Sequence, residues 1–68
     1  MKIALTIAGS DPTGGAGLQL DIKVFQHFGV YGLSAVSALT AQNTYAVKDI
    51  HSIDKIFMER QLSILLSD

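Results

Sequence analysis

Near its start the chain carries the stretch Gly9-Ser10-Asp11-Pro12-Thr13-Gly14-Gly15-Ala16-Gly17, here called the glycine turn. Four of the chain's six glycines and its only proline lie in it. An apolar run, residues 3–8, precedes the turn, and residues 18–28 follow with helical spacing of apolar side chains. Because glycine allows positive φ angles and close approach of the backbone, this pattern predicts a strand, a tight turn and a helix. The first N–H groups of that helix would favour a negative group at the turn.

Two phosphate-binding motifs do not fit the glycine turn. A P-loop has the pattern G-x-x-x-x-G-K-[ST], and Gly9 and Gly14 have its spacing, but Gly15 and Ala16 stand where Lys and Ser or Thr are needed. A dinucleotide-binding turn has the pattern G-x-G-x-x-G, and the candidate that begins at Gly15 ends in Leu20 instead of glycine. The turn therefore serves another kind of ligand, or it is a purely structural connection between strand and helix.

Composition narrows the classes of protein that the chain can belong to. Of its 68 residues, 49% are hydrophobic and only 16% are charged. This is apolar for so short a chain, because a small domain has little interior, so we expect these residues to lie inside something larger. The net charge of −1 gives no electrostatic basis for binding nucleic acid or a membrane surface. The chain has no cysteine, which excludes a disulfide framework, and it shows no signal peptide or membrane span, so we expect a cytoplasmic protein.

The order of the remaining segments predicts an α/β fold. Residues 30–40 form a second apolar run that suits a buried strand, 47–53 suit a short edge strand, and 55–66 suit an amphipathic helix. Gly29 is placed to end the first helix, and Asp54 is placed as the N-cap of the second. The order β-α-β, followed by β-α, predicts a parallel sheet with crossover helices. Two helices cannot cover both faces of such a sheet, so we expect the chain to be the opening part of a larger α/β domain, and the family resemblance described below implies a Rossmann-like three-layer sandwich.

Ligands of open α/β sheets bind beyond the carboxyl ends of the strands. That rule selects residues 9–11 after the first strand and 40–43 after the second, and parallel strands would bring both groups to one crevice. Asp21 lies within the apolar arc of the first helix, where a carboxylate is costly unless it is paired or hydrogen-bonded. It either accepts hydrogen bonds from a polar small molecule in the crevice or is a structural carboxylate bonded to a neighbouring loop.

Gln42 presents a similar choice. A side-chain amide offers a donor and an acceptor together, which suits the edge of a heteroaromatic ring such as an aminopyrimidine. The alternative is a strand-exit residue that closes a turn. Asp11, which precedes Pro12, indicates turn chemistry. We expect His27 and His51 to be solvated, and the sequence contains no cluster with metal-ligand spacing.

The residues described above resemble one known family. Residues 4–23, together with Phe25, 28–32 and 38–44, resemble the opening signature of the hydroxymethylpyrimidine/phosphomethylpyrimidine kinases, which belong to the ribokinase-like superfamily. The resemblance covers most of the chain. Leu20 departs from the alanine common at its position, which looks like a packing variation.

The resemblance implies a function and a set of site residues. It implies that MgATP phosphorylates the hydroxymethyl group of 4-amino-5-hydroxymethyl-2-methylpyrimidine and then the resulting monophosphate, in thiamine biosynthesis. Gln42 matches the glutamine that hydrogen-bonds the pyrimidine, Asp21 matches the helix aspartate at the same pocket, and Gly9 lies at the pocket floor. The family's catalytic base, its anion hole and most of its ATP site lie late in the chain, so we expect no catalytic residue and no kinase activity in residues 1–68 alone. A homodimer is implied by analogy with family members.

Two other functions stay open at this point. Some close relatives within the superfamily accept vitamin B6, so a pyridoxine or pyridoxal kinase is one alternative. The other is a non-catalytic fragment or module that binds the pyrimidine without transferring phosphate.

Overall fold

The computed structural model describes residues 1–67. In chain order its elements are β1 (Ile3–Ser10), α1 (Gly17–His27), β2 (Tyr31–Gln42), β3 (Val47–Ser52) and α2 (Lys55–Leu66). Every element that the sequence predicts is present, and α2 has the predicted bounds. Both β1 and β2 run two residues further than predicted, so Ser10 and Gln42 are the last residues of their strands.

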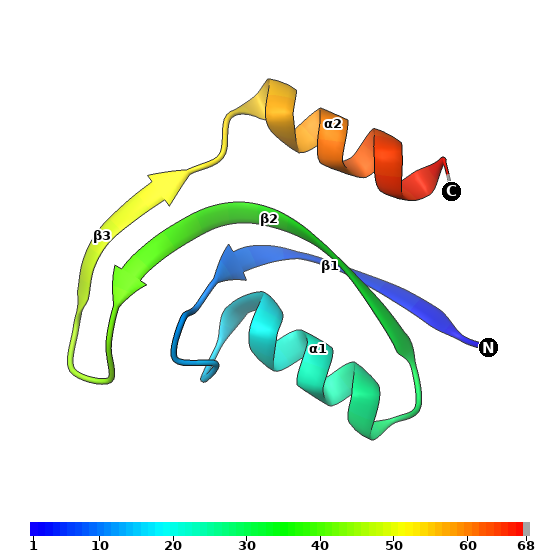
Figure 1. Ribbon diagram of the computed structural model, residues 1–68, viewed down its shortest axis with the longest axis horizontal. Helices are drawn as coiled ribbons and strands as arrows, with labels where there is room; N and C mark the ends of the chain where they lie inside the picture. The colour runs from blue at the N-terminus through cyan, green and yellow to red at the C-terminus, as the bar shows by residue number, and fades with distance from the viewer. Residues whose placement is uncertain (68) are drawn as a thin grey trace.

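The three strands form one sheet in the order β1-β2-β3. β1 and β2 are parallel, with Ile3 opposite Tyr31 and Ser10 opposite Leu39, and α1 is the crossover between them. The predicted β-α-β unit is therefore confirmed, and its two strands end at the same edge of the sheet (Figure 1).

The expectation of an all-parallel sheet is wrong for β3, which pairs with β2 in the antiparallel direction. Residues 43–46 are the whole connection between these strands. A parallel partner needs a crossover of about a dozen residues or more, so a connection this short allows only a hairpin. The side chain of Asn43 closes the hairpin turn, since its Oδ1 accepts from the backbone N–H of Tyr45 at 2.9 Å and of Ala46 at 3.2 Å.

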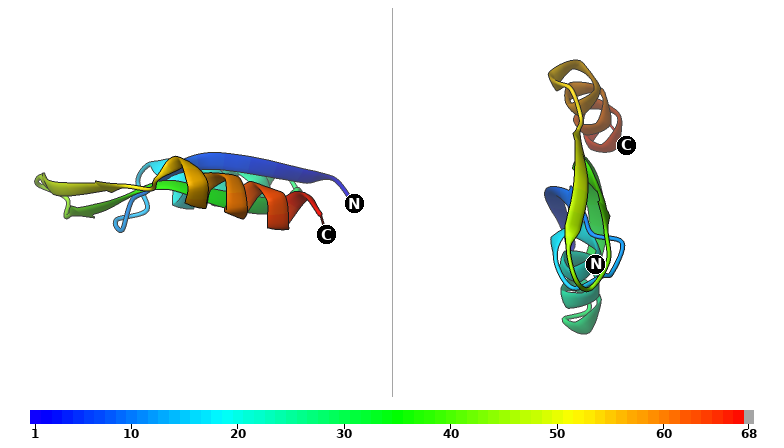
Figure 2. Two further views of the ribbon diagram at one scale, coloured as in Figure 1. Left: turned by 90° about the horizontal axis from the view of Figure 1, so that it is seen from above. Right: turned by 90° about the vertical axis from the view of Figure 1, so that its left-hand side faces the viewer.

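The two helices lie on opposite sides of the strands. Figure 1 shows α1 on one side of β1 and β2 and α2 on the other, and the end-on view in Figure 2 agrees. α1 packs against both parallel strands, whereas α2 packs against β2. Gly32 lets α1 lie close to β2, because a Cβ atom there would be only 2.7 Å from Ile22 Cδ1 and 2.9 Å from Phe25 Cδ2. This layering is that of a three-layer α/β fold.

Both predicted helix caps are confirmed. Asp54 Oδ1 accepts from the backbone N–H of Phe57 at 2.7 Å, which satisfies one of the first N–H groups of α2. Gly29 has φ +70° and follows the last turn of α1, where its N–H donates to Gln26 O at 3.1 Å and the N–H of Val30 donates to Phe25 O at 2.8 Å. This pair of bonds is a Schellman motif, which needs a residue of positive φ. Neither helix within residues 1–67 has the length and apolar character to cross a membrane.

Little of the apolar surface is buried. Ala35 is the one fully enclosed apolar residue in the described part of the chain. Large apolar side chains remain exposed on the strands and on α2, among them Ile3, Ile7, Ile50, Ile56, Ile64 and Leu66. Monomeric domains rarely leave so much apolar surface uncovered. That residues 1–68 are the N-terminal part of a larger domain stays a prediction, and this exposure supports it.

The side chain of Gln61 in α2 takes the place of a neighbouring strand beside β2. Its Oε1 accepts from the N–H of Val36 at 2.8 Å, and its Nε2 donates to Val36 O at 2.9 Å. The next residue, Ser37, accepts from the N–H of Ile53 just after β3 ends. Gln61 therefore pairs the backbone of β2 at the point where the β2–β3 ladder stops.

We expect Gln61→Leu to lower the free energy of unfolding by about 2 kcal/mol, because the backbone N–H and C=O of Val36 both lose their partner. Urea denaturation of the protein expressed from its complete reading frame measures this. Gln26→Leu, which removes an exposed amide on the outer side of α1, is the control and should change the value little. Equal losses in both variants would contradict the role of Gln61.

Candidate site at the carboxyl ends of the parallel strands

The carboxyl ends of β1 and β2 are joined by side chains. Thr40 Oγ1 donates to Ser10 O at 2.9 Å, and Gln42 Nε2 donates to Asp11 Oδ1 at 2.6 Å. The two groups of residues that the sequence placed at one edge of the sheet therefore do lie together. In open α/β sheets this edge is where ligands bind.

The glycine turn folds tightly over the end of β1. Gly17, the first residue of α1, has φ +64°, and a Cβ atom there would lie 2.3 Å from the carbonyl oxygen of Gly9. Only glycine allows both the positive φ and this close approach of helix to strand. No side chain caps the start of α1 at Ala16.

Asp11 is the centre of this turn. The residue is only 7% exposed, and its Oδ1 accepts from the N–H and the Oγ1 of Thr13, both at 2.8 Å, as well as from Gln42. The hydrogen bonds from the Thr13 side chain and backbone lower the pKa of Asp11, and the N–H groups of Ala16 and Gly15 lower it further. A carboxylate of the chain itself, ionised at neutral pH, therefore lies in the turn that precedes α1.

Gln19, in the first turn of α1, fixes the backbone on either side of this carboxylate. Its Oε1 accepts from the N–H of Asp11 at 2.8 Å, and its Nε2 donates to Ser10 Oγ at 2.6 Å. Ser10 and Asp11 are thereby tied to α1, while Thr40 and Gln42 tie them to β2.

Gln42 is half-buried at the end of β2. Because an ionised carboxylate can only accept hydrogen bonds, the Asp11 contact requires the NH2 group of Gln42 to point at Asp11. Within residues 1–67 the amide oxygen Oε1 accepts no hydrogen bond, and it is not among buried polar atoms lacking a partner, so it keeps access to solvent. Gln42 therefore has an acceptor and a second N–H that are not used by the contact with Asp11.

Asp21 faces the sheet, as its place in the apolar arc of the helix predicted. Its Oδ2 accepts from Thr6 Oγ1 at 2.5 Å, and Thr6 is buried in β1. Asp21 and Gln42 form no hydrogen bond with each other within residues 1–67. Gly9 lies at an irregularity in the β1–β2 register, and the carbonyl oxygen of Ala38 is 3.7 Å from the position that a Cβ atom would take.

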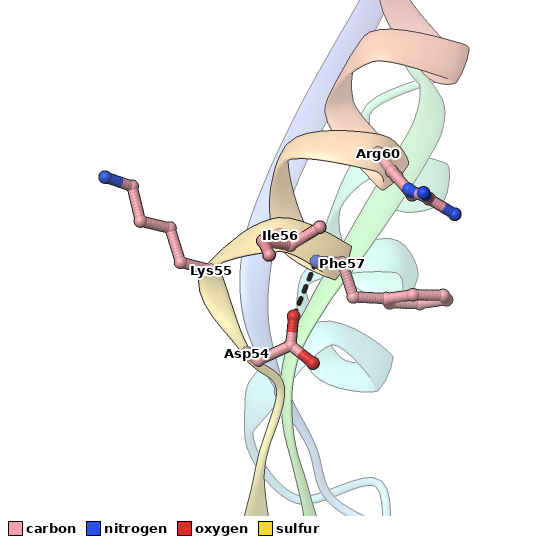
Figure 3. Close-up of a pocket in the computed structure, with 5 residues that line it drawn as sticks. All are labelled: Asp54, Lys55, Ile56, Phe57 and Arg60. Carbon is pink, nitrogen blue, oxygen red and sulfur yellow. Dashed lines mark hydrogen bonds between the residues drawn. The ribbon is translucent and has the colours of Figure 1, made fainter.

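Two pockets of the described residues lie away from these three residues. The larger one, about 560 Å³, is lined by residues around the start of α2, namely Asp54, Lys55, Ile56, Phe57 and Arg60 (Figure 3). The carboxylate in this pocket is that of Asp54, which already caps α2. A smaller one, about 170 Å³, lies on the β2–β3 hairpin against Leu39, Thr40, Ala41, Asp49 and His51. Neither is lined by Gly9, Asp21 or Gln42.

Comparison with known proteins identifies the family. The family model of phosphomethylpyrimidine kinase matches residues 11–68. The chain belongs to the phosphomethylpyrimidine kinase family. The hydroxymethylpyrimidine/phosphomethylpyrimidine kinase of Haemophilus influenzae is 53% identical over 68 residues, which are 100% of this chain and 25% of that protein. The chain spans about a quarter of the length of the curated relatives that it matches.

Solved structures of this family and of a related kinase share the fold. The crystal structure of phosphomethylpyrimidine kinase from Clostridium difficile 630 matches with a TM-score of 0.94 and 43% identity, over 100% of this chain and 29% of that one. The pyridoxal kinase of Staphylococcus aureus in complex with pyridoxal matches with a TM-score of 0.86 and 38% identity, over 98% of this chain and 26% of that one. The predicted ribokinase-like α/β fold is confirmed by these neighbours.

Within this family fold, sequence reasoning missed the importance of two residues. It assigned Asp11 to turn chemistry, which the bonds to Thr13 confirm, but not to the contact with Gln42. It assigned no site role to Gln19, although Gln19 binds Ser10 and Asp11. The roles of Gly9, Asp21 and Gln42 in substrate binding stay predictions. His27 and His51 are exposed, and residues 1–67 contain no group of three or more His, Cys, Asp or Glu that could hold a metal ion.

Proposed function

We propose that this protein is an ATP-dependent kinase of thiamine biosynthesis that phosphorylates 4-amino-5-hydroxymethyl-2-methylpyrimidine and then its monophosphate. Residues 1–68 supply the side that binds the pyrimidine. Membership of the family supports the reaction class. The observation that carries the role of this segment is the hydrogen bond of Gln42 to Asp11, which holds an amide at the sheet edge where ligands of this fold class bind.

The chemistry of the proposed contacts matches the substrate. A 4-aminopyrimidine carries an amino donor next to a ring-nitrogen acceptor, and the amide of Gln42 carries an acceptor next to a donor. Asp21 uses Oδ2 for Thr6, and within residues 1–67 its Oδ1 accepts no bond, so Oδ1 is the atom proposed to accept from the substrate. Gly9, which has no side chain, is proposed as the floor of the pocket.

The described residues do not fit a site for ATP or Mg²⁺. The glycine turn has no lysine in the P-loop position, and its Thr13 and Gly15 N–H groups donate to Asp11 Oδ1 and Thr13 Oγ1. Within residues 1–67 no carboxylate cluster could hold a metal ion. Most of the site for ATP and Mg²⁺ is therefore proposed to lie outside this segment. A homodimer, a cytoplasmic location and the absence of nucleic-acid or membrane partners likewise stay predictions.

A specific observation favours one alternative. The Staphylococcus aureus pyridoxal kinase, 38% identical to this chain, has been solved with pyridoxal and also with AMP-PCP together with pyridoxal. A pyridoxal or pyridoxine kinase is therefore the second candidate function. The non-catalytic pyrimidine-binding fragment is the third, and detection of phosphate transfer by the complete protein would eliminate it.

The test uses the protein expressed from its complete reading frame. We expect ATP-dependent phosphorylation of the hydroxymethylpyrimidine with a higher kcat/KM than for pyridoxal, and we expect Gln42→Leu to raise the KM for the pyrimidine about tenfold or more, because two hydrogen bonds to the ring are lost. Coupled ADP-release assays with both substrates measure this. Gln26→Leu is the control. A higher kcat/KM for pyridoxal would support the second candidate, and an unchanged KM in Gln42→Leu would remove Gln42 from the site.

A further inference from the structure

We infer that Asp11 is a positioning residue for substrate recognition, because it holds the amide of Gln42 in the one orientation that an aminopyrimidine edge can use. This inference rests on the proposed function and adds to it a residue that does not itself contact the ring. Asp11 lies in the glycine turn after β1, and Gln42 ends β2, so the contact joins the two strand ends that border the proposed pocket.

The geometry makes Asp11 a fixed anchor. The residue is 7% exposed, and its backbone N–H donates to Gln19 Oε1 at 2.8 Å. Oδ1 receives three hydrogen bonds, from the Thr13 N–H, from Thr13 Oγ1 and from Gln42 Nε2, the last at 2.6 Å. A carboxylate held by so many donors cannot rotate away without losing all of them, so Gln42 meets an acceptor at a constant position.

The charge of Asp11 decides which way the amide of Gln42 faces. An unanchored glutamine can exchange its oxygen and nitrogen by turning over, and the two faces recognise opposite hydrogen-bond patterns. A neutral partner with both donor and acceptor would permit either face. The carboxylate can only accept hydrogen bonds, so it selects the orientation of the amide in which Oε1 and the second N–H point away from Asp11. That face is complementary to an amino group beside a ring nitrogen.

The experiment compares Asp11→Asn, Gln42→Leu and the double variant in the protein expressed from its complete reading frame. Asn keeps the volume and one acceptor for Thr13 but also offers a donor, so Gln42 can turn over. We expect Asp11→Asn to raise the KM for the hydroxymethylpyrimidine about tenfold with kcat changed less than threefold. In the Gln42→Leu background the same substitution should raise KM less than twofold, because the residue through which Asp11 acts is absent.

Controls separate positioning from damage to the fold. Asp49→Asn removes an exposed carboxylate of β3 and should leave KM unchanged. Asp11→Glu keeps the charge but displaces it by one methylene, and it should raise KM as Asp11→Asn does. If one Asp11 variant is too unstable to thermal unfolding to be assayed, the KM of the other variant is compared with that of the unsubstituted protein. The side-chain NH2 resonances of Gln42 in the substrate-free protein supply a readout without activity, and they should shift in both Asp11 variants but not in Asp49→Asn.

Each outcome supports or overturns a separate statement. A KM rise in Gln42→Leu but none in either Asp11 variant would overturn the positioning role and leave the proposed function standing. Additive effects in the double variant, or unshifted Gln42 resonances, would also overturn it. Failure of the unsubstituted protein to phosphorylate the pyrimidine would overturn the proposed function and this inference with it.

Discussion

Gly17→Ala is expected to lower the free energy of unfolding by about 3 kcal/mol in the protein expressed from its complete reading frame. Two effects add. An alanine at φ +64° is in the left-handed region, and its Cβ atom would lie 2.3 Å from Gly9 O and 3.2 Å from Gly9 C. Both are backbone atoms of β1, so no side chain can move aside, and the start of α1 must shift away from the strand that bears the proposed pocket floor.

Gly29→Ala is the matched control for this substitution. Gly29 has φ +70°, nearly the same backbone conformation, but nothing lies within 4 Å of the position that its Cβ atom would take. It should lower the free energy of unfolding by about 1 kcal/mol, the contribution of the left-handed conformation alone. Urea denaturation of the two variants measures the difference. Equal losses would show that the close contact of Gly17 with Gly9 contributes nothing.

A polypeptide of residues 1–68 alone is expected to show no ATP-dependent phosphorylation of the hydroxymethylpyrimidine above the uncatalysed background. Transfer of a phosphoryl group needs cations, helix ends and N–H groups arranged around the developing charge. In this segment the N–H groups of Thr13 and Gly15 in the glycine turn donate to Asp11 and Thr13, and within residues 1–67 no carboxylate cluster could hold a metal ion.

Steady-state ADP release by the purified 68-residue polypeptide checks this expectation. The protein expressed from the complete reading frame, assayed at the same concentration, is the positive control. Turnover by the polypeptide at more than a few per cent of the control rate would show that its residues contain transfer chemistry that we have not found. Circular dichroism of the same sample would establish whether its helices form when so much apolar surface is exposed.

The elements of the fold followed from local sequence patterns. The apolar run before Gly9 and the helical spacing after Gly17 predicted β1 and α1, because strand and helix periodicity are properties of neighbouring residues. Gly29 and Asp54 predicted the helix ends for the same reason, since a cap bonds only to the adjacent turn. Loop length also determines the direction of β3, because four residues cannot cross over a sheet, whereas the β-α repetition predicted a parallel strand.

The sequence predicted the position of the candidate site in the fold but not the hydrogen bonds between its side chains. The polar residues after β1 and β2 were assigned to one sheet edge from topology alone, and the register of the parallel strands confirms that their ends meet. The sequence could not predict that Asp11 accepts a hydrogen bond from Gln42, or that Asp21 accepts one from Thr6. These contacts span 31 and 15 residues, and a small shift of register would have offered each side chain another partner.

By itself the sequence determined the order of strands and helices, the turn that only glycines can form, and the family to which the chain belongs. Tertiary structure alone placed the carboxylate of Asp11 in the turn before α1 and brought the amide of Gln42 within 2.6 Å of it. The physical reason is that propensity and capping act between neighbours along the chain. A carboxylate can form hydrogen bonds with distant residues only after the sheet has brought them close to it.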